Sequence, residues 1–206
     1  MEPITIHPDQ HYDPEASKLG MWLFIFTELL LFGGLFIVYS IYRYLNQEAF
    51  QLAAHELDTF IGAFNTVILL VSSMTIAMST SSLQKKNIKL TVYLIGITLI
   101  LALVFLVNKY FEWGIKFEHG IFPGSQHLQS DFGQGEILFF GLYFVMTGLH
   151  ALHIIAGMVL MLVALAKVRK GTVHAGHPML LENAGLYWHL VDLIWIFLFP
   201  LFYLIH

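Results

Sequence analysis

The sequence contains no cysteine and only a small share of charged residues. Of its 206 residues, none is Cys and 12% are Asp, Glu, Lys or Arg. A chain without cysteine has no thiolate zinc site, iron–sulfur cluster, disulfide or cysteine nucleophile. The 10 basic residues are scattered and the formal net charge is -4, which gives no basic surface for nucleic acid. Thiol chemistry and nucleic-acid binding are therefore excluded.

Apolar residues dominate the sequence instead. They make up 57% of the chain, more than an ordinary soluble domain contains. A helix that spans a bilayer needs about 20 mostly apolar residues, and five stretches are long enough. They run from about 19 to 42, 59 to 83, 90 to 113, 137 to 166 and 184 to 205. These stretches predict an all-α, polytopic membrane protein formed by a bundle of five transmembrane helices.

The start of the chain differs from the rest in composition. Residues 1–17 are polar and include Pro3, Pro8 and Pro14. They lack the basic start and apolar middle of a cleavable signal peptide, so we expect them to be retained. The predicted organisation is a polar tail over residues 1–17 and one five-helix domain over residues 18–206.

The distribution of basic residues predicts the orientation in the membrane. Five helices place the two termini on opposite sides, and Lys and Arg are enriched in cytoplasmic loops. With the N-terminus inside, seven basic residues fall on the inner side and three on the outer side, which accounts for all 10. The inner set is Lys18, Lys85, Lys86, Lys89, Lys167, Arg169 and Lys170, and the outer set is Arg43, Lys109 and Lys116. We expect a cytoplasmic N-terminus and a C-terminus on the outer side.

One acidic residue lies deep within the first predicted helix. Glu28 follows about 10 residues of that helix, which corresponds to a depth of roughly 15 Å at 1.5 Å per residue. A charge near the centre of a bilayer costs about 2.5–3.5 kcal/mol or more unless it is paired, protonated or hydrated. Glu28 is therefore either a carboxyl that ties helices together or a group with a lipid-binding or proton-linked role.

Ionisable residues also occur in pairs along the fourth and fifth predicted helices. His150 and His153 are three residues apart, as are His189 and Asp192, and residues at this spacing share one side of a helix. Counting 1.5 Å per residue from the outer side places His150 and His189 at depths of about 20 Å and 18 Å. We expect Glu28, His150, His189 and Asp192 to meet near one level of the membrane.

The histidines leave two interpretations open. Two histidines at matched depth on different helices could bind a haem. Each histidine also has a polar residue at helical spacing and bulky neighbours, which favours structural hydrogen bonds and no bound metal. Lys109 and Glu112, one turn apart on the third predicted helix, are expected to form a local ion pair.

Three stretches resemble a known family, and they occur in the family's order. They are residues 18–28 (KLGMWLFIFTE), 147–153 (TGLHALH) and 187–198 (YWHLVDLIWIFL). Together with Glu112 and Trp113, they resemble subunit III of haem–copper terminal oxidases, the cytochrome c oxidase subunit 3 family. Mitochondrial members carry two further helices before the glutamate-bearing one, so the chain is similar to the shorter, five-helix bacterial members.

The resemblance implies an accessory, non-catalytic subunit of a proton-pumping oxygen reductase in aerobic respiration. Members of the family bind no redox cofactor, because the haems and copper lie in partner subunits. They pack beside subunit I in a complex with subunit II and, in some cases, further respiratory subunits. They hold phospholipid, and their intramembrane carboxylate, here Glu28, lies near the lipid and the proton-uptake route. The implied location is the bacterial cytoplasmic (inner) membrane.

Other functions are compatible with the sequence. The parent complex could accept electrons from quinol instead of cytochrome c, because electrons enter through other subunits. A haem-binding membrane anchor would use His150 and His189, and a proton carrier would use Glu28. The proton carrier is less favoured because no chain of acidic residues accompanies Glu28 on the other helices.

Overall fold

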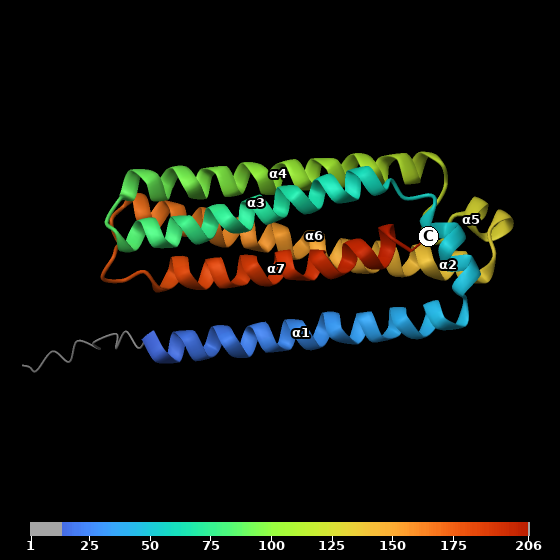
Figure 1. Cartoon of the computed structure of the whole chain (residues 1–206), viewed down its shortest axis with the longest axis horizontal. Helices are drawn as coiled ribbons and strands as arrows, with labels where there is room; N and C mark the ends of the chain where they lie inside the picture. The colour runs from blue at the N-terminus through green and yellow to red at the C-terminus, as the bar shows by residue number, and fades with distance from the viewer. Residues whose placement is uncertain (1–13, 206) are drawn as a thin grey trace, which may run out of the picture.

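The computed structural model describes residues 14–205, and these residues form helices connected by turns and short loops, with no strand among them (Figure 1). In chain order the helices are α1 (Pro14–Leu45), α2 (Gln47–Ala54), α3 (Thr59–Gln84), α4 (Ile88–Glu118), α5 (Gln126–Asp131), α6 (Gln134–Arg169) and α7 (Met179–Tyr203). Five of them, α1, α3, α4, α6 and α7, are long and apolar enough to cross a membrane. The predicted all-α class is confirmed, with five candidate membrane spans among the described residues.

The helices extend beyond the apolar stretches that predicted them. α1 begins at Pro14, so residues 14–17 are helical although they were assigned to the polar tail, and the first 13 residues lie outside the described part. Proline is suited to the first turn of a helix, where its missing N–H has no helical partner. α6 has 36 residues, which corresponds to about 54 Å at 1.5 Å per residue, longer than the roughly 30 Å hydrocarbon layer. Hydropathy therefore located the apolar part of the helices but missed residues such as the start of α1 and both ends of α6.

The ends of α3 and α4 are fixed by local hydrogen bonds. Asp58 caps α3 by accepting from the backbone N–H groups of Phe60 and Ile61, at 2.8 and 3.2 Å. The tight turn to α4 contains Lys86 in the left-handed region, with φ 61°, and the Asn87 side chain caps α4. The turn reverses the chain, so α3 and α4 pack side by side as an antiparallel hairpin (Figure 1). Farther along the hairpin, Thr75 and Thr98 hydroxyls lie 2.8 Å apart.

α7 is the most enclosed of the five long helices, and α1 is the least. Of the most apolar 18-residue window in each helix, 56% is buried in α7 but only 11% in α1. The indole rings of Trp188 and Trp195 on α7 are fully buried, and they donate hydrogen bonds to Ser72 and Thr66 of α3, both at 3.0 Å. α1 lies along the edge of the bundle beside α7 (Figure 1).

Hydrogen bonds attach α1 to α6 and α7 near both ends of α1 and between them. Near one end, Asn183 of α7 donates to the Ser17 hydroxyl at 3.1 Å. Near the other end, the Tyr39 hydroxyl donates to the backbone carbonyl of Leu201. Between them, Glu28 contacts His153 of α6 at 2.8 Å. The acidic residue singled out from the sequence is thus one of the polar contacts by which this outer helix is held.

Candidate functional site

Glu28 and His153 form a directed pair between α1 and α6. His153 Nε2 lies 2.8 Å from Glu28 Oε2, and His153 Nδ1 lies 2.7 Å from the backbone carbonyl of Leu149. Because a carbonyl oxygen only accepts, Nδ1 must donate a proton to it. Nε2 then either accepts a hydrogen bond from a protonated Glu28 or, on a protonated imidazole, donates one to a carboxylate. In both cases the Glu28–His153 pair holds one proton between its two side chains.

Aromatic rings surround this pair on the protein side. Phe32 approaches the His153 ring edge-on with centroids 5.3 Å apart, and Tyr187 stacks on it at 6.5 Å. The Tyr187 hydroxyl also donates to the His153 carbonyl at 3.1 Å. The side chains of Glu28 and His153 keep 15% and 13% of their surface exposed. The pair is therefore packed against rings on one side and reaches the exterior of the bundle on the other.

The other residues expected at this level have different surroundings. His150 is fully buried, stacks on Trp195 with centroids 5.3 Å apart, and makes no hydrogen bond through either ring nitrogen. His189 Nδ1 lies 2.6 Å from the Ser73 hydroxyl. Asp192 is buried, and its carboxyl group lies close to the same Ser73 hydroxyl. Ser73 of α3 is therefore a common neighbour of His189 and Asp192, whereas neither ring nitrogen of His150 has a hydrogen-bond partner.

The reason is the direction in which each side chain leaves its helix. Residues three apart differ by about 60° around a helix with 3.6 residues per turn. His150 consequently points between α4 and α7, where it contacts Phe105 and Trp195, whereas His153 points toward α1. Depth alone could not distinguish them. Among residues 14–205, no three His, Asp or Glu side chains lie close enough to hold a metal ion.

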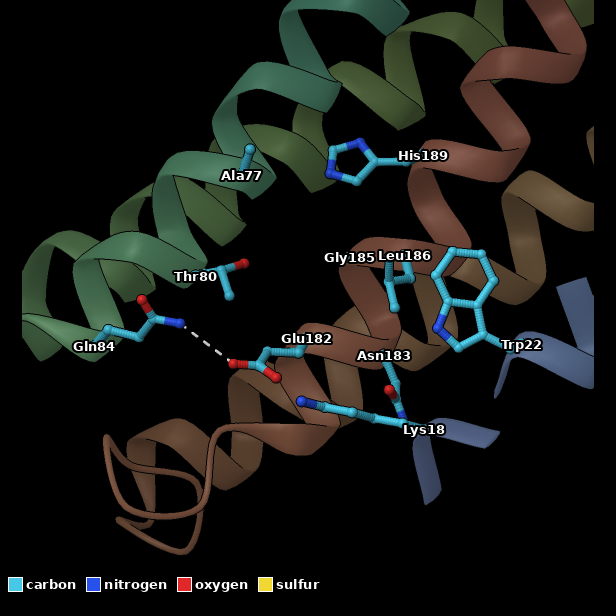
Figure 2. Close-up of a pocket in the computed structure, with 10 residues that line it drawn as sticks. All are labelled: Lys18, Trp22, Ala77, Thr80, Gln84, Glu182, Asn183, Gly185, Leu186 and His189. Atoms are coloured by element: carbon cyan, nitrogen blue, oxygen red, sulfur yellow. Dashed lines mark hydrogen bonds between the residues drawn. The ribbon is translucent and has the colours of Figure 1, made fainter. Parts of the chain in front are cut away.

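A cavity lies between α1, α3 and α7 at the end of the bundle where α1 and α7 begin (Figure 2). Its volume is about 450 Å³. His189 lines one end, and Lys18, Gln84 and Glu182 line the other, close to the ends of their helices. Glu28 and His153 are not part of its lining. The cavity is thus a second polar feature of this chain, separate from the Glu28–His153 pair.

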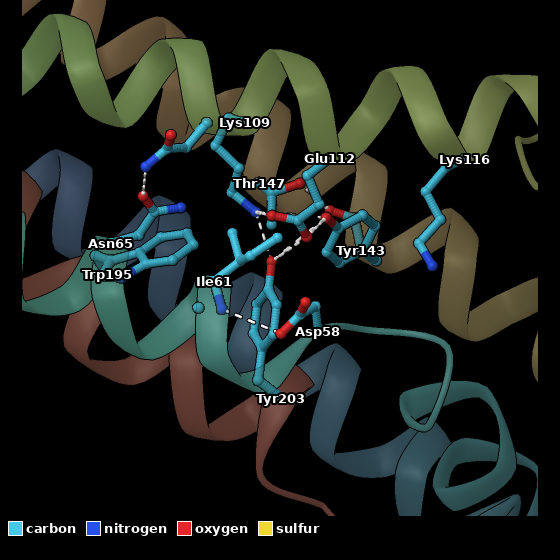
Figure 3. Close-up of polar contacts among 12 residues, drawn as sticks. Asp58, Ile61, Asn65, Lys109, Glu112, Lys116, Tyr143, Thr147, Trp195 and Tyr203 are labelled. Atoms are coloured by element: carbon cyan, nitrogen blue, oxygen red, sulfur yellow. Dashed lines mark hydrogen bonds and ion pairs between the residues drawn. The ribbon is translucent and has the colours of Figure 1, made fainter.

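Lys109 and Glu112 form the expected contact and belong to a larger buried network (Figure 3). The Lys109 ammonium lies 3.2 Å from Glu112 Oε2 and donates to the Tyr203 and Tyr143 hydroxyls at 2.6 and 3.3 Å. Both tyrosine hydroxyls donate to Glu112 Oε1. The ammonium also lies 4.8 Å from the centre of the Trp195 ring. Four polar side chains from α4, α6 and α7 therefore satisfy one another inside the bundle.

Sequence reasoning missed the two tyrosines and one further lysine. Tyr143 and Tyr203 lie 31 and 91 residues from Glu112, so no local spacing indicated them. Lys116 is 6% exposed, and its ammonium donates to the backbone carbonyl of Glu56, just before α3. It was counted among the outer basic residues on sequence alone, but it is buried in the protein, as Lys109 is. For the two tyrosines, a polar group within a predicted apolar stretch was the available signal, whereas Lys116 follows the stretch that was predicted to end at about residue 113.

The family model described as cytochrome c oxidase subunit III matches residues 14–206. The chain belongs to the cytochrome c oxidase subunit III family. This match covers all three signature stretches and confirms the resemblance drawn from them. Together with the five apolar helices, it identifies a multi-pass membrane protein, and Glu28, His153 and the Lys109–Glu112 network all lie inside the matched region.

Three relatives illustrate the range of the family. Cytochrome c oxidase subunit 3 of Thermostichus vulcanus is 30% identical over 196 residues, which cover 95% of this chain and 90% of the relative. Heme-copper oxidase subunit I+III of Aeropyrum pernix is 31% identical over 201 residues, 94% of this chain but only 23% of that protein. Probable quinol oxidase subunit 3 of Staphylococcus aureus strain USA300 is 27% identical and is covered to 91%. The chain spans nearly all of two relatives and about a quarter of the third.

Proposed function

We propose that the chain is an accessory, non-catalytic subunit of a haem–copper oxygen reductase in aerobic respiratory electron transport. The observation that carries this proposal is the subunit III family match over residues 14–206. The haems and copper then belong to partner subunits, and the present chain supports their stability and proton uptake. Oxygen chemistry is not assigned to any residue of this chain.

The partner is proposed to be subunit I, with subunit II in the same complex. One relative bears the name subunit I+III, so in that protein the two parts belong to one chain. Fusion keeps two parts at high effective concentration, as expected for parts that act together. Some relatives are named as subunits of a cytochrome c oxidase and others as subunits of a quinol oxidase. Cytochrome c and quinol are therefore both candidate electron donors. We favour cytochrome c, and the donor oxidised by the purified complex tests that choice.

The Glu28–His153 pair is proposed to be a lipid-linked or proton-linked tie that holds α1 against α6. Its hydrogen bond, at 2.8 Å, and its partial exposure support this role. A role as a stand-alone proton carrier is disfavoured, because the Glu28 carboxyl is hydrogen-bonded to His153. The haem anchor is disfavoured because His150 is enclosed by Trp195 and Phe105.

The proposed location is a bacterial cytoplasmic membrane, with the N-terminus in the cytoplasm and the C-terminus on the outer side. Seven basic residues near the α1 start, the α3–α4 turn and the α6–α7 loop support this orientation. Two of the three opposing basic residues, Lys109 and Lys116, are buried in protein contacts. The asymmetry of basic residues available to the solvent is therefore larger than the raw count.

Co-purification tests the proposed function directly. The chain, carrying an affinity tag, is extracted from its own membranes in mild detergent, and its partners are identified by mass spectrometry. We expect subunits that contain haem and copper to co-purify with the chain, and we expect the purified complex to reduce oxygen. The chain separated from those partners should give no Soret absorption and no stoichiometric haem, copper, iron or zinc. Extraction without any oxidase subunit, or haem bound to the isolated chain, would contradict the proposal.

A further inference from the structure

Ser73 of α3 lies beside two ionisable side chains of α7 inside the bundle. Its hydroxyl lies 2.6 Å from His189 Nδ1, and the Asp192 carboxyl group lies close to the same hydroxyl. His189 and Asp192 are three residues apart, so they share one side of α7. A serine hydroxyl can donate one hydrogen bond and accept another at the same time. The three residues, which we call the Ser73 cluster, can therefore form a continuous row of hydrogen-bonding groups.

One end of the Ser73 cluster is open to the cavity between α1, α3 and α7. His189 is half-buried and lines one end of that cavity, where it extends from α7 toward α3 (Figure 2). Glu182, at the other end of the cavity, precedes His189 by seven residues, which corresponds to about 10 Å along α7. The cavity volume of about 450 Å³ has room for several water molecules of about 30 Å³ each. Water can therefore reach the His189 ring from the end of the bundle where α7 begins.

The other end of the Ser73 cluster is closed. Asp192 is only 3% exposed, is not part of the cavity lining, and belongs to none of the ion pairs between residues of the described part. A carboxyl group inside an apolar layer must be paired, protonated or hydrated. The polar route from Asp192 to water leads through Ser73 and His189.

The ionisable groups on the helices around α7 have other partners. α7 packs against α1, α3 and α6, and α3 contains no Asp, Glu, His, Lys or Arg. Glu28 of α1 and His153 of α6 lie 2.8 Å apart and contact each other. His150 of α6 stacks on Trp195, and the charged pair of α4 is satisfied by its two tyrosines. The Ser73 cluster is therefore separate from the polar groups described above.

We propose that the Ser73 cluster is a proton-binding site, in which Asp192 gains and loses a proton through Ser73 and His189 by way of the cavity. In the loaded state, the Asp192 acid donates to Ser73 Oγ, and the Ser73 hydroxyl donates to His189 Nδ1. On release, the Asp192 proton moves to Ser73 Oγ while the serine's own proton moves to Nδ1. The resulting imidazolium gives its Nε2 proton to water in the cavity, which leaves a carboxylate and a neutral imidazole. Loading runs through the same steps in reverse.

This inference rests on the proposed function and deepens it. The cavity opens at the end of the bundle that is proposed to face the cytoplasm, the side from which the oxidase complex would take up protons. Glu28 and His153 are not part of the cavity lining, so the site is distinct from that pair. Asp192 would thus store one proton on the inner side of the complex, within this chain.

Infrared spectroscopy of the purified, assembled complex tests this site. Difference spectra between two pH values record the C=O stretching bands of carboxyl groups that gain or lose a proton. Transfer to D₂O then shows whether that proton exchanges. We expect Asp192→Asn to remove one such band that the natural complex shows. Asp131→Asn, at an exposed position of α5, is the matched control and should leave that band in place.

The relay through the serine is tested by the rate of exchange. Ser73→Ala removes the hydroxyl between Asp192 and His189 and leaves both ionisable groups. We expect the Asp192 band to shift in D₂O roughly 100-fold more slowly in this variant, because a positioned group that transfers a proton contributes at least that much to the rate. Ser81→Ala makes the same change at an exposed position of α3 and should exchange as the natural complex does.

A blocked cavity tests the route without changing the Ser73 cluster. Ala77 is exposed and lines the cavity, and the natural chain has no cysteine. A bulky thiol reagent on Ala77→Cys should slow exchange of the Asp192 proton, whereas the same variant before labelling should exchange normally. Ala156→Cys, at an exposed position of α6 outside the cavity, should exchange normally before and after labelling.

Three results would overturn the proton-binding site. They are a set of bands that Asp192→Asn does not change, an Asp192 band that never exchanges, and an exchange rate that neither Ser73→Ala nor the blocked cavity affects. Haem content and partner subunits are recorded in the same preparations. Loss of the partners with an intact Asp192 band would contradict the accessory function alone, so the two failures are distinguished.

Discussion

Glu28 offers a direct test of a structural role against a proton-carrying role. In Glu28→Gln, the amide can donate to His153 Nε2, so the contact between α1 and α6 is preserved while titration is lost. We expect the assembled complex to retain more than about half of its oxygen turnover, whereas loss of a required proton-transfer group costs roughly 100-fold or more. Oxygen consumption by the purified complex measures this, with the exposed Glu118→Gln as a control. A collapse of turnover with normal haem spectra would show that Glu28 carries protons.

The protonation state of the pair can be tested by chemical modification. A proton on Glu28 leaves no charge on the pair, whereas a proton on His153 Nε2 leaves an ion pair in the apolar layer. Protonated carboxyls react with carbodiimides, so an apolar carbodiimide should modify Glu28 in the intact complex, as read by peptide mass spectrometry. His153→Leu should leave that reactivity in place. An unreactive Glu28 that becomes reactive only in His153→Leu would indicate an ion pair instead.

At the residue scale, sequence reasoning could find the unusual groups but not all their partners. Depth within an apolar stretch was enough to single out Glu28, and the spacing of three was enough to predict the contact of Lys109 with Glu112. The partner of Glu28 is 125 residues away, and choosing His153 over His150 requires the rotation of α6 about its own axis. Depth estimates contain no information about that rotation.

At the scale of helices, the Lys109–Glu112 network joins α4 to α6 and α7. Removing one partner of a buried ion pair leaves an uncompensated charge, which destabilises a protein by about 3–5 kcal/mol. We expect Lys109→Met and Glu112→Gln each to lower the thermal unfolding midpoint of the purified complex, and the double variant to lower it less than the sum of both. Lys170→Gln should leave the midpoint unchanged. Additive losses would mean that the two side chains act independently.

The long helices could be predicted from the sequence, whereas the two short ones could not. A run of apolar residues long enough to cross a bilayer identifies α1, α3, α4, α6 and α7. α2 and α5 have 8 and 6 residues, too few for a recognisable apolar period. They are specified by local contacts, such as the Ser125 hydroxyl that accepts from the Leu128 N–H at the start of α5. Together they lie at the end of the bundle near the C-terminus (Figure 1).

At the scale of the whole molecule, the two ends of the bundle differ in the charge they present. The end with the α3–α4 turn and the α6–α7 loop carries the seven basic residues of the inner set. At the other end, Lys109 and Lys116 are only 5% and 6% exposed, so Arg43 is the basic residue of that set left at the surface. Lysines buried in protein contacts cannot interact with lipid head groups or the aqueous phase. The positive-inside rule therefore predicts the orientation more strongly from the structure than from the sequence.

Cysteine labelling tests that orientation, because the natural sequence has no thiol of its own. Lys85→Cys introduces one at the end of α3, and Gln129→Cys introduces one on α5, both at exposed positions. A membrane-impermeant thiol reagent added to intact cells or spheroplasts should label the residue-129 variant and leave the residue-85 variant unlabelled. Lysis of the cells should make the residue-85 thiol reactive, which controls for its accessibility. Labelling of the residue-85 variant in intact cells would reverse the orientation and place the Lys18–Glu182 cavity at the outer surface of the membrane.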